Sequence, residues 1–172
     1  AVKSLKAGKE PDLAQPLAVV TEINLHVPAL LPDDYCPSIH ERLVLYKRLA
    51  NCEHVDELQL LQEELVDRFG LLPEATQALV DSHRLRIESK PLGVTKVDAS
   101  ADGIALQFQP NPPIDPARII QLIQTRKSFK LSGQDRLRVE EKHPGLAERV
   151  QPARAIFREL AQPPVPEKAK HR

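Results

Sequence analysis

Residues 30–75 read LLPDDYCPSIHERLVLYKRLANCEHVDELQLLQEELVDRFGLLPEA, and this stretch decides the fold. In its second half, apolar residues recur three and four positions apart, which is the spacing of one buried helix face. They are Leu58, Leu61, Leu65 and Phe69. A neighbouring face of the same helix carries Leu60, Glu64, Asp67 and Arg68. The first face predicts a core contact, and the second is available to a partner.

Three consecutive helices are predicted from this stretch and the residues after it. The first runs from about Pro37 to about Asn51, and five residues are expected to face inward: Ile39, Leu43, Tyr46, Leu49 and Ala50. The second runs from about residue 54 to 69 and ends at Gly70, a residue suited to a left-handed C-cap. The third runs from about residue 73 to 90. Helices with such short joints must pack as one layer.

Shorter runs on either side predict strands. Residues 21–27, TEINLHV, alternate apolar and polar side chains, which is the period of a half-buried strand. Residues 94–99 and 103–108 form a hairpin around an Asp-Gly turn, and residues 128–133 and 136–141 form a second one. Helices are predicted from about Pro116 and over about 147–161, where Pro152 fits only in the first turn. The order β-ααα-ββ-α-ββ-α indicates an α+β fold, with a small, mainly antiparallel or mixed sheet packed against a helical layer.

The expected domain covers residues 21–162. Residues 1–20 are interpreted as the end of an incoming helix and a linker, because AVKSLKAG is followed by Pro11 and the chain starts without Met. That start suggests a piece of a longer polypeptide. Residues 163–172 are polar and proline-rich and are expected to form a disordered or tag-like tail.

Composition excludes several classes of protein. Lys plus Arg and Asp plus Glu both total 24, so the chain lacks the basic excess typical of nucleic-acid-binding domains. No apolar run approaches the ~20 residues that span a bilayer. Cys36 and Cys52 have no partner at metal-ligand spacing, and they are interpreted as reduced thiols of a cytoplasmic protein.

Catalytic motifs are missing from the sequence. Neither GxxxxGK[ST] nor GxGxxG occurs among the six glycines, so neither glycine-rich phosphate cradle is present. The six histidines are scattered, without HExxH, and there is no GxSxG nucleophile elbow. We therefore expect no cofactor, no metal and no enzymatic activity of this chain itself.

Charge is unevenly distributed. Residues 53–67 contain six acidic residues and no lysine or arginine. A solvated helix face is one interpretation, and a docking face for a basic partner is the other. Basic residues gather separately, at Arg126, Lys127, Lys130, Arg136 and Arg138, where contact with nucleic acid is an alternative.

The segments LLPDDYCPSIHERLVLYKRLA and ELVDRFGLLPE resemble the C-terminal domain of bacterial transcription-repair coupling factors. The resemblance covers about residues 1–162. It implies a parent protein that is an ATP-driven translocase on double-stranded DNA, which displaces stalled RNA polymerase and recruits the damage-recognition ATPase of nucleotide excision repair. The motor motifs of that family are absent from this chain.

For this domain the resemblance implies regulation rather than catalysis. In the family, the domain packs on an N-terminal module similar to the excision repair helicase subunit and masks the surface that captures the damage-recognition ATPase. Leu60, Glu64, Asp67 and Arg68 are the residues expected to dock. The alternative is an accessory DNA-binding module that uses the basic cluster at 126–138.

Overall fold

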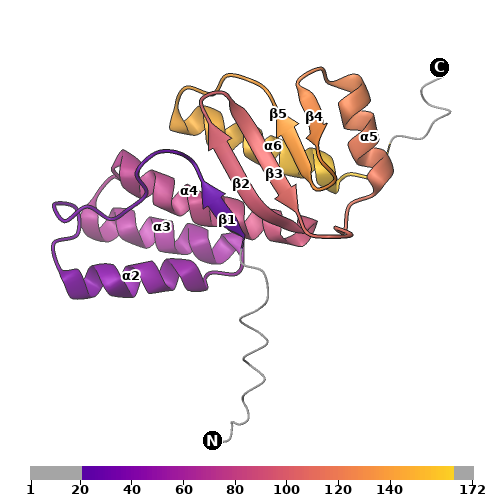
Figure 1. Cartoon of the computed structure of the whole chain (residues 1–172). Helices are drawn as coiled ribbons and strands as arrows, with labels where there is room; N and C mark the ends of the chain where they lie inside the picture. Colours follow the sequence, from indigo (N-terminus) through magenta and orange to yellow (C-terminus); the bar gives the residue numbers. More distant parts are fainter. Residues whose placement is uncertain (1–20, 165–172) are drawn as a thin grey trace, which may run out of the picture.

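The computed structural model describes residues 21–164, which form a sheet and two connected groups of helices (Figure 1). The sheet has five strands in the order β1-β2-β3-β5-β4. Only β1 (Glu22–Asn24) and β2 (Val94–Ser100) pair in parallel, and the other neighbours are antiparallel. The predicted α+β class and element order are confirmed. The expectations for residues 1–20 and 165–172 lie outside the described residues.

The helical layer consists of α2 (Ile39–Asn51), α3 (Val55–Phe69) and α4 (Glu74–Ser89). The N–H of Glu41 donates to Ser38 Oγ at the start of α2, so Ser38 is the N-cap and Pro37 precedes the helix instead of opening it. Gly70 ends α3 with a φ of 100°, a backbone angle that disfavours any residue with a side chain.

Both predicted hairpins are present. β2 and β3 (Gly103–Phe108) are joined by a two-residue turn, and β4 (Phe129–Ser132) and β5 (Arg136–Val139) are joined by a three-residue turn. The first strand is shorter than predicted. His26 adopts a φ of 58°, and its N–H donates to Asn24 Oδ1, so the chain turns away directly after β1.

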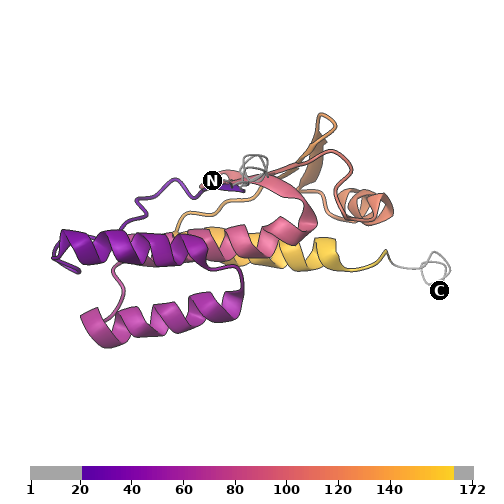
Figure 2. The same cartoon turned by 90° about the horizontal axis from the view of Figure 1, so that it is seen from below.

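Two apolar clusters meet at α4. One lies between the sheet and the helices α4, α5 (Pro116–Thr125) and α6 (Leu146–Ala161), and the other lies among α2, α3 and α4. Ala78 and Leu85 of α4 belong to the first cluster, while Leu79 and Val80 belong to the second. Figure 2 shows the resulting order, with the sheet on one side of α4 and α6 and with α3 on the other. No helix of residues 21–164 lies over the opposite face of the sheet.

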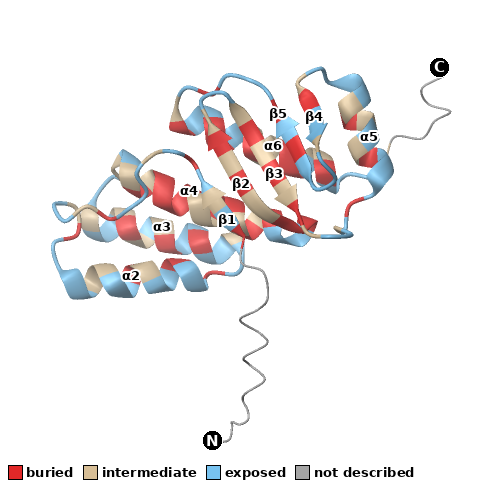
Figure 3. Ribbon diagram, in the orientation of Figure 1, coloured by how far each residue is buried: buried red, intermediate tan, exposed pale blue. Residues whose placement is uncertain are grey.

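The predicted orientation of α2 is wrong at three of its five positions. Ile39 and Leu43 are 67% and 63% exposed, and Ala50 is exposed, whereas Leu45 and Leu49 are buried (Figure 3). The helix carries two apolar stripes. Only the stripe with Leu45 and Leu49 meets α3 and α4, and no described element covers the other.

The last helix contains a proline that, from the sequence, would fit only in the first turn. α6 begins at Leu146, so Pro152 lies in the second turn, and the carbonyl of Glu148 loses its helical donor. Burial of Ala153, Phe157 and Leu160 against the sheet offsets this loss.

Candidate functional site: the α2–α3 surface

The helices α2 and α3 run antiparallel and share an exposed side, which we call the α2–α3 surface. It comprises Glu41, Val44 and Arg48 of α2 and Glu57, Leu60, Glu64, Asp67 and Arg68 of α3. All four residues predicted to dock therefore lie together. The core stripe predicted for α3 is also confirmed: Leu58, Leu61 and Leu65 are buried, and Phe69 is partly buried against the same cluster.

A chain of ion pairs connects the two helices across this surface. Arg48 donates from Nη1 and Nη2 to the two oxygens of Glu64, at 2.8 and 2.7 Å. Arg68 donates to Glu64 at 3.1 Å and to Glu41 at 3.0 Å. Fork-shaped pairs of this kind fix side-chain geometry as well as charge.

This network keeps Glu64 ionised. Hydrogen bonds from Arg48, with a smaller contribution from Arg68, lower the pKa of the Glu64 carboxyl to about 2. The side chain remains 35% exposed, so it is paired at the surface and not turned into the core. The charges of Glu64 and Arg68 are thus already compensated within the domain.

Leu60 and Asp67 differ from these two residues. Leu60 is 68% exposed. The side chain of Asp67 is exposed and forms no hydrogen bond or ion pair with another described residue. Of the four predicted docking residues, these two have the side chains that are free to meet a partner directly.

A groove of about 400 Å³ runs between the two helices. Arg48, Asn51 and Cys52 line it from α2 and its end, and Glu57, Leu60, Leu61 and Glu64 line it from α3. Glu57 was not among the predicted docking residues. The sequence signal that could have identified it is its position as the third residue of α3. A glutamate there accepts a hydrogen bond from the backbone N–H of the N-cap residue.

The basic cluster divides into two groups in the structure. Lys130 and Arg138 are cross-strand neighbours on the open face of the sheet, and Glu140 lies 3.0 Å from Lys130 and 3.9 Å from Arg138. The pKa of Glu140 is lowered chiefly by its hydrogen bond from Lys130.

The other group lies after α5. Arg126 pairs with Glu159 at 2.6 Å and stacks on Phe129, with Lys127 exposed beside it. Of the five basic residues, only Lys127 and Arg136 have no ion pair among the described residues. Three of the five basic residues therefore have an acidic neighbour, although only two carboxylates, Glu140 and Glu159, serve them.

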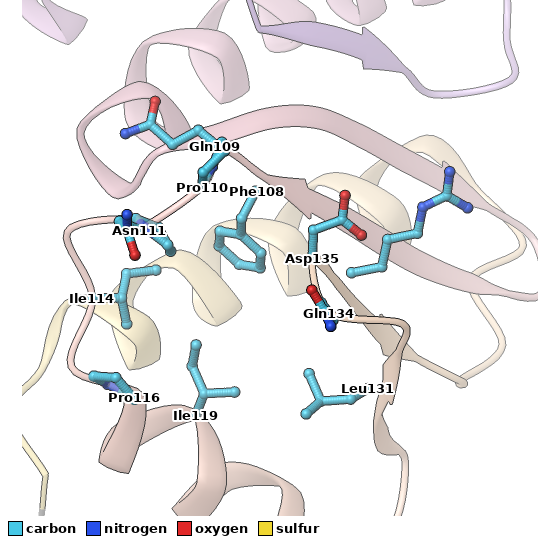
Figure 4. A pocket seen from close by; sticks show the side chains of 12 residues that line it. Phe108, Gln109, Pro110, Asn111, Ile114, Pro116, Ile119, Leu131, Gln134 and Asp135 are labelled. Carbon is cyan, nitrogen blue, oxygen red and sulfur yellow. The ribbon is translucent and has the colours of Figure 1, made fainter.

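A half-open cavity of about 920 Å³ lies between the loop after β3, the helix α5 and the β4–β5 turn (Figure 4). Phe108, Ile114, Ile119 and Leu131 form its apolar wall. Its only charged lining residues are Asp135 and Arg136, and no histidine, cysteine, serine or lysine of the described chain lines it. The lining thus contains no nucleophile with an adjacent base.

Within residues 21–164, no group of three or more His, Cys, Asp or Glu side chains is placed to hold a metal ion. None of the helices in this part of the chain has the length and hydropathy needed to cross a bilayer.

Comparison with known proteins places the chain in a family. The model of the TRCF domain matches residues 25–119. The transcription-repair-coupling factor of Escherichia coli (strain K12) is 37% identical over 163 residues, which is 94% of this chain and 14% of that protein. The corresponding factor of Haemophilus influenzae is 46% identical over 124 residues, or 72% of this chain and 11% of that protein. The chain thus spans only a small part of the length of these relatives.

A solved structure agrees with the fold. A crystal structure of the C-terminal domain of transcription-repair coupling factor superposes with a TM-score of 0.69 at 21% identity, covering 83% of this chain and 92% of that one. The chain belongs to the TRCF domain family, and its fold is that of the C-terminal domain of a transcription-repair coupling factor.

Proposed function

We propose that this chain is a non-catalytic, autoinhibitory domain of a transcription-repair coupling factor. In this proposal it docks through the α2–α3 surface on the N-terminal module of the same polypeptide. The docked domain masks the surface by which that module binds the damage-recognition ATPase of nucleotide excision repair. RNA polymerase is a partner of the parent protein and not of this domain.

One observation carries the proposal: Leu60, 68% exposed, and the unpaired carboxylate of Asp67 lie on one face of α3, on a surface where ion pairs join α2 and α3. An exposed side chain that a partner can desolvate completely, with polar contacts around it that exclude water, has the arrangement of an interface hot spot. The side chains that are already paired, Arg48, Glu64 and Arg68, lose less conformational entropy when a partner orders the surface.

The four docking residues then have two different roles. Leu60 contributes apolar contact area, and Asp67 offers a free carboxylate to a basic group of the partner. Glu64 and Arg68 contact the partner as an already paired unit, and they also hold α2 and α3 together through Arg48 and Glu41. Charge at such a rim contributes more to orientation and encounter rate than to affinity.

Because the domain and its docking site belong to one polypeptide, a weak interface can stay closed through high effective concentration. Engagement of polymerase or DNA by the parent protein would shift this equilibrium toward the open state. A coupling free energy of about 1–3 kcal/mol would change access to the masked surface roughly 5- to 150-fold.

The test is a double variant of the intact parent protein, Leu60→Ala with Asp67→Lys. Neither side chain belongs to the ion-pair network, so the domain should keep its thermal stability. We expect affinity for the damage-recognition ATPase to rise by about 5- to 150-fold. Unchanged affinity in a protein with unchanged melting temperature would overturn the proposal. Asp102→Lys, in the turn between β2 and β3 and therefore away from α3, is the charge-matched control and should behave as wild type.

A further inference from the structure

We infer that the groove between α2 and α3 receives an arginine side chain from the protein surface that covers it, and that Glu57 is the carboxylate that binds this arginine. The inference rests on the proposed docking function and names the chemistry of its central contact.

The groove suits a side chain that is apolar along its length and charged at its end. Its floor is apolar, because Leu61 and Cys52 are only 4% and 7% exposed. Leu60 forms one rim and Glu57 lies one helical turn before it. At about 400 Å³ the groove is near the lower limit for ligand pockets, which fits a single long side chain better than a large ligand. The aliphatic stem of an arginine can lie on such a floor while its guanidinium reaches the carboxylate.

Glu57 is fixed in position before any partner arrives. Its Oε1 accepts hydrogen bonds from the backbone N–H groups of Glu53 and His54, at 2.8 and 3.1 Å. Its Oε2 has no hydrogen-bond partner among the described residues. The same two backbone bonds lower the pKa of the carboxyl, so the side chain stays anionic. One oxygen thus holds the helix end and the other is available to an incoming donor.

Glu64, the second carboxylate of the groove, is not available in this way. Arg48 binds both of its oxygens, and Arg68 binds Oε2 as well. The only cation that lines the groove is therefore already neutralised. An incoming cation therefore gains more electrostatic stabilisation at Glu57 than at Glu64.

The charge around the groove points to the same occupant. Residues 53–67 contain six acidic residues and no lysine or arginine. Asp56, Glu57 and Asp67 are exposed along α3, so an acidic or neutral side chain in the groove would meet a negative field. The positive charge of arginine is attracted by this field, and its guanidinium can also donate more than one hydrogen bond.

The experiment compares two single variants of the full chain, Glu57→Gln and Glu63→Gln. Glutamine at position 57 keeps an oxygen that can accept the two capping hydrogen bonds but has no charge. Glu63 has the same chemistry on the same helix but does not line the groove. The probe is the separately expressed N-terminal module of the parent polypeptide, titrated calorimetrically at low and moderate salt. Thermal unfolding of each variant checks that the domain remains folded.

We expect Glu57→Gln to weaken binding by about tenfold or more and to reduce its salt dependence, while Glu63→Gln binds as the wild type does. Wild-type affinity of the Glu57→Gln chain would overturn this inference and leave the proposed function standing. Equal losses in the two variants would also overturn it, because they would show a diffuse charge effect without a specific contact. Absence of binding by the unaltered chain would remove the proposed function, and this inference with it.

Discussion

At the scale of single residues, the charged side chains of α3 divide into paired and free groups, and sequence alone could not tell them apart. The acidic block was visible in the sequence, and so was the helix that carries it. The partner of Glu64, however, is Arg48 on the preceding helix, 16 residues away. Pairing at that separation depends on how two helices pack, and no local pattern encodes it.

The ion-pair network predicts a specific response to acid. The pKa of Glu64 is about 2 in the folded chain, below its ordinary value of 4.5, so its stabilising effect is present above pH 4.5 and is lost as the pH falls toward 2. Because the side chain is 35% exposed, we expect its ion pairs to contribute only about 0.5–1 kcal/mol to the free energy of unfolding. Glu64→Gln should lower the free energy of unfolding at pH 7 by this amount. The variant should also lose less stability than the wild type when the pH falls from 4.5 to 2. Urea denaturation across this range measures both effects, and a variant that keeps the acid dependence of the wild type would contradict them.

A second pH effect belongs to His83. Burial, with a smaller effect of Arg86, lowers the pKa of its imidazole to about 4 from 6.5. Between these two values the unfolded chain binds a proton that the folded chain does not, so stability falls as the pH drops from 6.5 to 4. The loss should be on the order of 1–3 kcal/mol. His83→Gln, which keeps an acceptor for the Arg86 Nε–H, should flatten the urea-unfolding profile in this window. A profile that does not change would show that His83 titrates normally.

At the scale of elements, α3 was predictable and α2 was only partly so. The stripe of α3 is unambiguous, because its alternative face is charged. α2 presents two apolar stripes, and the period of its sequence favoured the stripe with Ile39 and Leu43, which the structure leaves exposed. The choice between the stripes is made by contacts with α3 and α4, and these contacts lie outside the helix itself. Both hairpins were predicted because their turns carry a local signal.

Two leucines of α3 test the distinction between its core face and its docking face. Leu58 is fully buried and Leu60 is 68% exposed. Leu58→Ala should destabilise the domain by about 2–5 kcal/mol, because it leaves a cavity in the helical core. Leu60→Ala should change stability by less than about 0.5 kcal/mol. Chemical denaturation of the two variants makes the comparison, and similar losses in both would mean that Leu60 is part of the core.

At the scale of the whole molecule, the sequence indicated which elements exist but not the strand order. β1 and β2 pair in parallel although three helices separate them, and β5 is inserted between β3 and β4. Long-range packing determines such strand pairings, and no local pattern in a single sequence indicates them. Helical spacing and the acidic block pointed to this face of α3 as a candidate site, and the resemblance to a known family supplied its docking role, while the role inferred for Glu57 required the structure.

One buried arginine connects distant parts of the fold. Arg149 of α6 donates hydrogen bonds to the carbonyl oxygens of Leu25, His143 and Pro144, at 2.8, 2.9 and 3.3 Å. Arg149→Met should therefore cost about 2–4 kcal/mol, since it leaves buried carbonyls without donors. Amide hydrogen exchange should show the largest loss of protection at β1, which the Leu25 contact secures. Uniform loss across the sheet would indicate that the arginine does not specifically hold β1.

The most direct test of masking is a competition experiment. The separately expressed N-terminal module is first bound to a labelled damage-recognition ATPase, and this chain is then titrated into the complex. If the α2–α3 surface covers the ATPase site, the chain should displace the ATPase, and the chain carrying Leu60→Ala and Asp67→Lys should not. A ternary complex that holds the module, the ATPase and this chain together would contradict the account.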